Sequence, residues 1–304
     1  MLFVWFFLGL VLLFVGGEFL VRGAVGLAHR FRIPPMVIGL TIVGFGTSTP
    51  ELLVSLQAAL GGVPDVAIGN VIGSNIANIL LILGLSAVIA PVAAAFAPIR
   101  RDLAVMVGST VLLWLIMLGG VISHLEGGLM LAALAAYLLI SLSSGAHPPE
   151  EPAHEVASPW LATFAVIGGL AALMLGARFL VDSASEMARA VGVSEAVIGL
   201  TIVAIGTSLP ELATSLIAAL RGNSAIALGN VLGSNIFNIL GILGLTAAIH
   251  PVPVDARFPA FDLPIALAAA LAMVALSYLH DRVGRGAGAA FLAAYLGYTL
   301  WIGL

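Results

Sequence analysis

The chain contains one stretch twice. Positions 37–92 align without a gap with positions 197–252, and 38 of these 56 pairs are identical. Each copy places a glutamate directly after a proline inside a long apolar run, as Pro50 and Glu51 and as Pro210 and Glu211. An ionisable group at bilayer depth costs about 2.5 to 3.5 kcal/mol on insertion scales and commonly marks an ion or proton pathway. The duplication therefore predicts a paired acidic site.

The composition indicates a membrane protein. Of the 304 residues, 61% are hydrophobic and only 9% are charged, which is too little charge for a water-soluble surface. A bilayer core about 30 Å thick needs about 20 apolar residues per helix. We expect ten transmembrane helices, near residues 2–25, 35–60, 66–89, 102–122, 127–144, 159–182, 194–220, 224–249, 260–279 and 287–304. The expected fold is an all-α polytopic membrane protein without a nucleic-acid partner.

The spacing of the repeat predicts an inverted arrangement. Five expected crossings separate any residue from its equivalent 160 positions later, so the two halves enter the membrane from opposite sides. We expect two inverted repeats of five helices, residues 1–144 and 159–304, joined by a polar cytoplasmic linker at 145–158. Such halves commonly hold a binding site near the bilayer midplane, on interrupted helices at their interface.

Charged residues predict the orientation and two ion pairs. All eleven basic residues are arginine, and arginines near helix ends are enriched on the cytoplasmic side. The expected cytoplasmic loops hold Arg30 with Arg32, Arg100 with Arg101, Arg221, and Arg282 with Arg285. Both termini then lie outside the cytoplasm, with the chain in the cell (inner) membrane. The first helix of each half carries opposite charges four residues apart, interpreted as ion pairs within that helix: Glu18 with Arg22, and Arg178 with Asp182. The sequence says nothing about oligomeric state.

The two prolines predict broken helices. Pro50 has no N–H to donate and its ring clashes with the carbonyl of Gly46, so the helix bends or opens there. Pro210 has the same effect in the second copy. Backbone freed at membrane depth is tolerated only where it is buried in protein or lines a cavity. The carbonyl oxygens of 44–47 and 204–207 are therefore candidate cation ligands.

The next apolar run of each copy adds polar oxygens. Ser74 and Asn78 are four residues apart and share one helix face, as do Ser234 and Asn238. Glycines four apart allow a neighbouring backbone to approach closely, at 69 and 73 and at 229 and 233. Four further asparagines are expected to make hydrogen bonds between helices instead of binding ions: Asn70, Asn75, Asn230 and Asn235.

The ligand types favour a hard cation as substrate. Carboxylates, hydroxyls, amides and carbonyls suit Ca²⁺, which takes 6 to 8 oxygens from flexible mixtures of ligands, whereas Mg²⁺ prefers a tight octahedron that keeps waters. Transition metals recruit His or Cys, and the chain has no Cys and no His in these motifs. No resident cofactor is expected.

Two pairs of motifs carry a family resemblance. Gly-Thr-Ser-Thr-Pro-Glu with Gly-Ser-Asn-Ile-Ala-Asn, and Gly-Thr-Ser-Leu-Pro-Glu with Gly-Ser-Asn-Ile-Phe-Asn, resemble the two α-repeats of the cation/calcium antiporter superfamily, in its prokaryotic sodium/calcium exchanger branch. The resemblance implies that Glu51 and Glu211 are central Ca²⁺ ligands, joined by the carbonyls of Thr47 and Thr207. It implies that flanking Na⁺ sites are lined by Gly44, Ser48 and Ser74 and by Ala204, Ser208 and Ser234. Asn78 and Asn238 match the pair that faces the middle of the site.

Two details refine this resemblance. The potassium-dependent exchangers of the superfamily carry an acid at the position of Asn238, so this chain resembles the potassium-independent type. Proton-coupled members typically show Gly-Asn-Ala-Ala-Glu-His where this chain has Gly-Asn-Val-Ile-Gly-Ser, which favours Na⁺ over H⁺ as the coupling ion.

The function expected is exchange of Na⁺ for Ca²⁺ by a secondary active antiporter, with alternating access to one shared midplane site. The alternative within transport is a proton- or other-cation-coupled exchanger that uses the same two glutamates. An intramembrane enzyme is not expected, because the chain has no His-Glu-x-x-His and no Gly-x-Ser-x-Gly motif. A passive channel fits two inverted halves less well than an exchanger does.

Overall fold

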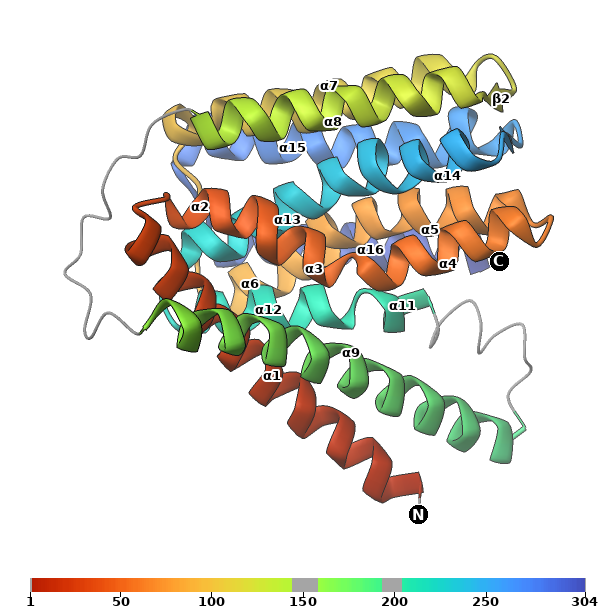
Figure 1. Ribbon diagram of the computed structural model, residues 1–304. Coiled ribbons are helices and arrows are strands. Elements are labelled where there is room, and N and C mark those ends of the chain that lie inside the picture. The colour runs from red at the N-terminus through yellow and green to blue at the C-terminus, as the bar shows by residue number, and fades with distance from the viewer. Residues whose placement is uncertain (1, 144–157, 193–203, 304) are drawn as a thin grey trace.

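A computed structural model describes residues 2–143, 158–192 and 204–303, and these are almost entirely helical (Figure 1). In the first half the elements, with η for π-helix, are α1 (Leu2–Phe31), α2 (Pro35–Ile38), η1 (Gly39–Val43), α3 (Gly44–Thr47), α4 (Thr49–Leu60), α5 (Pro64–Ala77), η2 (Asn78–Leu83), α6 (Gly84–Ile89), β1 (Val92–Ala93), α7 (Phe96–Met117), β2 (Val121–Ile122) and α8 (His124–Ser143). In the second half they are α9 (Pro159–Ala190), α11 (Ala204–Thr207), α12 (Leu209–Leu220), α13 (Ser224–Phe237), η4 (Asn238–Leu243), α14 (Gly244–Ile249), β3 (Val252–Pro253), η5 (Phe258–Asp262), α15 (Leu263–His280), β4 (Arg282–Val283) and α16 (Arg285–Gly303).

The described helices include several of membrane length. Six are long and apolar enough to cross a bilayer, and the bent pair Pro35–Thr47 and Thr49–Leu60 makes a seventh. The six are Leu2–Phe31, Pro64–Ile89, His124–Leu142, Pro159–Ala190, Ser224–Ile249 and Phe258–His280. The other three expected helices fall on α7, on α12 and on α16. The start of the expected helix at 194–220 and nearly all of the 145–158 linker lie outside the described residues.

Helices α6 and α14, which are equivalent in the two halves, run in opposite directions. The bounds of α12, α13, η4, α14 and β3 are those of α4, α5, η2, α6 and β1 shifted by 160. Strand β1 follows α6 and pairs with β4, whereas β3 follows α14 and pairs with β2. The 22 residues of α7 separate β1 from β2 by about 33 Å. Since α6 ends near one end of α7 and α14 near the other, the two helices point in opposite directions.

Each broken helix opens at a serine. Ser48 ends α3 and precedes α4 with ψ 8°, and Pro50 lies in the first turn of α4. The two segments meet at a bend of 46°. Ser208 repeats this geometry with ψ 8° before α12, which has Pro210 in its first turn. The break therefore falls just before the proline in both halves, as the sequence predicts, and it places Glu51 and Glu211 in the first turn of a new helix.

Helices α1 and α9 lie against each other below the other helices in Figure 1, in contact through small residues. A Cβ atom on Gly169 of α9 would lie 2.6 Å from the backbone nitrogen of Leu20 and 2.7 Å from the carbonyl oxygen of Gly16, both on α1. At the adjacent Gly168, no described atom lies within 4 Å of such a Cβ. The close contact with α1 is therefore made at Gly169, whereas the space beside Gly168 is open in the described structure.

Gly169→Ala is expected to destabilise the protein. The added methyl group would lie 2.6 Å from the backbone nitrogen of Leu20, so α1 and α9 would have to move apart. The cost should be about 2 kcal/mol, or about 5 °C in the unfolding temperature in detergent. Gly168→Ala is the matched control and should leave that temperature unchanged or slightly raised, since alanine favours a helix over glycine. Equal unfolding temperatures for the two variants would contradict the packing described here.

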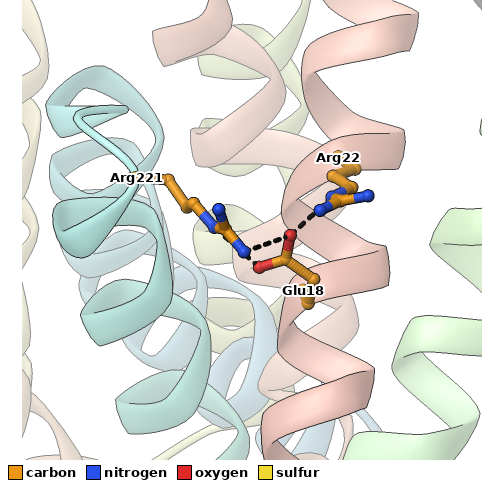
Figure 2. Close-up of polar contacts among 3 residues, drawn as sticks. All are labelled: Glu18, Arg22 and Arg221. Carbon is orange, nitrogen blue, oxygen red and sulfur yellow. Dashed lines mark hydrogen bonds and ion pairs between the residues drawn. The ribbon is translucent and has the colours of Figure 1, made fainter.

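The carboxylate of Glu18 lies between two arginines (Figure 2). Arg22 binds it within α1, and Arg178 pairs with Asp182 at 3.6 Å within α9, so both predicted ion pairs are confirmed. The contact with Arg221, at the end of α12, was not predicted. Its Nε donates to Oε2 at 2.9 Å, and its Nη2 lies 2.8 Å from Oε1. Glu18 therefore also joins α1 to α12, the helix that carries Glu211.

Candidate cation site

Two buried glutamates form the centre of the site. Glu51 is 1% exposed and Glu211 is 2% exposed, and each lies in the first turn of its helix. The partial positive charge of a helix N-terminus favours a carboxylate in that position. Each side chain has one carboxylate oxygen, Oε2, without a hydrogen-bond partner in the described structure. A cation bound to these Oε2 atoms would supply the missing partner and balance the buried negative charge.

The serines at the breaks contact the glutamate of the opposite half. Ser48 donates to Oε1 of Glu211 at 3.0 Å, and Ser208 donates to Oε1 of Glu51 at 3.3 Å. These contacts bring the two broken helices together, so that each half supplies part of the surroundings of the other half's acid.

Two asparagines add partnerless oxygens to the site. Asn78 and Asn238 are the first residues of η2 and η4, and both are 1% exposed. Each amide nitrogen donates a hydrogen bond, whereas each Oδ1 has no partner in the described part of the chain. Leaving a buried acceptor unsatisfied costs about 1 to 3 kcal/mol. With the two Oε2 atoms, the site offers four such oxygens, two from each half.

Most of the predicted flanking residues contact a residue of the opposite half. The hydroxyl oxygens of Ser208 and Ser74 lie 3.5 Å apart, and Ser234 donates to the carbonyl of Gly44 at 3.4 Å. Thr47 is fully buried and donates to Oδ1 of Asn230 at 3.2 Å. Ala204 is the first residue of α11, three positions before Thr207, and its place as a ligand stays a prediction.

Asn70 and Asn230 hold the acid-bearing helices, as the sequence predicted. Asn70 donates to the backbone carbonyl of Glu51 at 3.1 Å and to Oγ of Ser55 at 2.9 Å. Asn230 donates to the carbonyl of Glu211 at 3.3 Å and to Oγ of Ser215 at 2.9 Å. Each amide thereby joins its own helix, α5 or α13, to the acid-bearing helix that precedes it in the same half. The expected interhelical hydrogen bonds are confirmed.

Two further buried acids were missed in the sequence. Asp102 accepts a hydrogen bond from Tyr137 at 3.0 Å and lies 3.6 Å from Arg101. Asp262, 160 positions later, accepts one from Tyr298 at 3.0 Å and lies 3.2 Å from Arg257. The same register that aligns positions 37–92 would have found this pair. Because each acid has an arginine beside it, neither adds free negative charge to the protein interior.

The donor set of the site suits a hard cation. Its groups are carboxylates, hydroxyls, amide oxygens and backbone carbonyls, the ligands that Ca²⁺ accepts and Na⁺ shares. No cluster of three or more His, Cys, Asp or Glu residues able to hold a metal occurs within residues 2–143, 158–192 and 204–303. The arrangement is that of a binding site shared between two halves.

Known proteins resemble this chain over nearly its whole length. The family model described as "Sodium/calcium exchanger protein" matches residues 1–143 and 161–304. The chain is 41% identical over 302 residues to a putative antiporter, CaxA, of Alkalimonas amylolytica, covering 95% of each chain. It is 36% identical over 308 residues to the inner membrane protein YrbG of Escherichia coli, covering 97% of this chain and 94% of that one.

A solved structure matches over nearly the whole length. The sodium-calcium exchanger NCX_Mj, soaked without Na⁺ and Ca²⁺, superposes with a TM-score of 0.89 at 33% sequence identity. The match covers 99% of this chain and 98% of that one. The similarity therefore extends to both halves of the chain.

Proposed function

The chain belongs to the sodium/calcium exchanger family, and from this membership we propose that it is a secondary antiporter in which Na⁺ moving down its gradient drives Ca²⁺ the other way. The protein is a multi-pass membrane transporter and not an enzyme. Na⁺ and Ca²⁺ are its substrates, and no cofactor takes part. The antiport mechanism and the residues that carry it make up the proposal.

One observation carries this proposal: four buried oxygens without hydrogen-bond partners in the described structure, two from each half, lie on elements that pack against one another, α4 with η4 and α12 with η2. They are Oε2 of Glu51, Oε2 of Glu211, Oδ1 of Asn78 and Oδ1 of Asn238. The two glutamates supply a charge of −2, which one Ca²⁺ neutralises. Na⁺ ions match that charge only by occupying several neighbouring oxygens, including those of Ser48, Ser74, Ser208 and Ser234. Because Ca²⁺ and the Na⁺ ions bind the same carboxylates, they cannot occupy the site together, and this competition enforces exchange.

The proposed architecture is ten spans in two inverted repeats, residues 1–144 and 159–304, joined by the linker at 145–158. The opposite directions of α6 and α14 support it. The site then lies at the interface of the repeats and opens alternately to each side of the membrane. The name of the Escherichia coli relative supports placement in an inner membrane.

Counter-transport in proteoliposomes tests the function. Uptake of labelled Ca²⁺ should follow an imposed Na⁺ gradient and stop when that gradient is removed. A H⁺ gradient alone should drive no uptake. Uptake driven by H⁺ in place of Na⁺ would favour a proton-coupled exchanger, and uptake without any counter-ion gradient would indicate a channel.

Exchange is expected to proceed without K⁺. Asn238 offers an amide oxygen and no charge, so the site has only the two formal charges of Glu51 and Glu211 to balance. Initial rates of Na⁺-driven Ca²⁺ uptake should be equal in K⁺-containing and K⁺-free solutions of matched ionic strength. If uptake requires added K⁺, the protein belongs with the potassium-dependent exchangers.

The loops rich in arginine are proposed to face the cytoplasm, with both termini on the other side. The chain has no native cysteine, so a thiol reagent would label only a cysteine introduced in place of Glu150 or Pro64. An impermeant thiol reagent added to intact cells should reach position 64 and should reach position 150 only after the membrane is opened. Labelling of both positions from the same side would contradict the orientation and the inverted repeat.

A further inference from the structure

Asn75 and Asn235 join the two halves through reciprocal hydrogen bonds. The amide nitrogen of Asn75 donates to the backbone carbonyl of Asn235 at 3.1 Å, and that of Asn235 donates to the carbonyl of Asn75 at 3.4 Å. Both side chains are buried. The sequence predicted that these residues bond between helices, which is confirmed, but it did not predict what their oxygens contact.

These contacts fix which way each amide points. A backbone carbonyl only accepts hydrogen bonds, so the end of each side chain that faces it must be the NH₂ group. The Oδ1 of Asn75 therefore faces Asn238, and the Oδ1 of Asn235 faces Asn78. Each oxygen accepts a hydrogen bond from the amide nitrogen there, at 3.0 Å and 2.9 Å respectively.

The orientation of Asn75 and Asn235 also fixes that of Asn238 and Asn78. Because the NH₂ groups of Asn238 and Asn78 face acceptors, their own Oδ1 atoms must point the other way. Those two Oδ1 atoms are the amide oxygens without a partner at the proposed cation site. A flipped amide would present NH₂ hydrogens to a cation and would also leave two amide oxygens facing each other.

We infer that Asn75 and Asn235 are positioning residues for ion binding: they hold the amides of Asn238 and Asn78 with oxygen toward the cation and nitrogen away. They also select the side chain at those positions. The Oδ1 of Asn75 accepts a hydrogen bond, so it suits an amide at 238 and repels an ionised carboxylate there. By disfavouring a carboxylate at position 238, Asn75 keeps the formal charge of the site at −2. This inference rests on the proposed function of the site in binding Ca²⁺.

A double-mutant cycle tests the inference. Equilibrium Ca²⁺ binding is measured in Na⁺-free solution for purified wild type, Asn75→Leu, Asn238→Ala and the double variant. Leucine removes the acceptor at similar volume, and Asn75→Leu should weaken Ca²⁺ binding about tenfold. In the Asn238→Ala background no amide remains to be oriented, so the same change should weaken binding less than about twofold.

Asn70→Leu is the matched control, since Asn70 joins α5 to α4 without contacting Asn238. Its effect should be the same in both backgrounds. If Asn75→Leu does not fold, the symmetric cycle of Asn235→Leu with Asn78→Ala makes the same prediction. If the wild type binds Ca²⁺ but the losses caused by the two single substitutions simply add in the double variant, the inference is wrong and the proposed function still holds. Wild type that binds no Ca²⁺ would overturn the proposed function and the inference with it.

Discussion

Glu51→Gln and Glu211→Gln are each expected to abolish Ca²⁺ exchange. Glutamine keeps the shape of the side chain and its Oε1 atom, so the hydrogen bonds from Ser208 to position 51 and from Ser48 to position 211 can persist. Each change removes half of the negative charge in a buried site where charges interact strongly. A remaining charge of −1 leaves a bound Ca²⁺ with an uncompensated positive charge. Initial rates of Na⁺-driven Ca²⁺ uptake in proteoliposomes measure the loss, which should exceed about 100-fold.

Glu126→Gln is the matched control for this experiment. Glu126 lies in the first turn of α8 and accepts hydrogen bonds from the backbone nitrogen and the hydroxyl of Ser123, away from the site. Its uptake rate should remain near that of wild type. Near-normal exchange by either Glu51→Gln or Glu211→Gln, in protein that elutes as a folded species, would mean that the two carboxylates do not form the shared site.

Gly233→Ala is expected to cause the second large loss. A Cβ atom on Gly233 of α13 would lie 2.4 Å from the carbonyl oxygen of Leu40 and 2.6 Å from its Cα atom, so the added methyl group forces η1 away from α13. The next residue, Ser234, donates a hydrogen bond to the carbonyl of Gly44, which directly follows η1. The same displacement would break this hydrogen bond. We expect either little folded protein or exchange at least about tenfold slower, because small displacements of ligands strongly reduce rates.

Gly108→Ala serves as the control for this substitution. Gly108 lies within α7 and is exposed, and no described atom comes within 4 Å of the position that an added methyl group would take. The yield of monodisperse protein and the uptake rate should both match wild type. If Gly233→Ala matched wild type in both measurements, the close approach of η1 to α13 would not be needed for the site.

The sequence predicted where Glu51 and Glu211 lie relative to the broken helices, because the repeat and the proline act locally. A glutamate after a helix-breaking proline must lie at the start of a new helix, and the 160-residue register pairs it with its equivalent. The partner of each serine could not be predicted in this way. Ser48 is three residues from Glu51 in sequence but donates to Glu211, since the packing of the two halves decides which acid it reaches.

The glycine stripes show the same limit. The sequence predicted that both pairs of glycines admit a neighbouring backbone. Gly229 and Gly233 do so, because a Cβ atom added to them would lie 2.6 and 2.4 Å from the carbonyl oxygens of Met36 and Leu40, and this half of the prediction is confirmed. At Gly69 the nearest described atoms belong to the ring of Phe258, at 3.7 Å. The stretch 196–200, equivalent to the segment that Gly229 and Gly233 contact, lies outside the described residues, and that half stays a prediction.

Features that depend on long-range packing were missed. Arg221 is equivalent to Gly61 in the other half, so its bond to Glu18 has no counterpart that the repeat could have revealed. Asp102 and Asp262 share the 160-residue register, but their tyrosine partners are 161 positions apart, so the register finds the two acids and not the hydrogen bonds that they accept. Side chains outside the repeat register therefore have to be located in the folded structure.

The shared site is tested most directly by equilibrium Ca²⁺ binding to the purified wild-type protein with Na⁺ as competitor. The account predicts that Na⁺ displaces Ca²⁺ completely, and that displacement rises more steeply than first order in Na⁺ concentration because several Na⁺ ions replace one Ca²⁺. Matching the ionic strength with choline separates competition from screening. Ca²⁺ that remains bound at saturating Na⁺ would contradict a single site used by both ions.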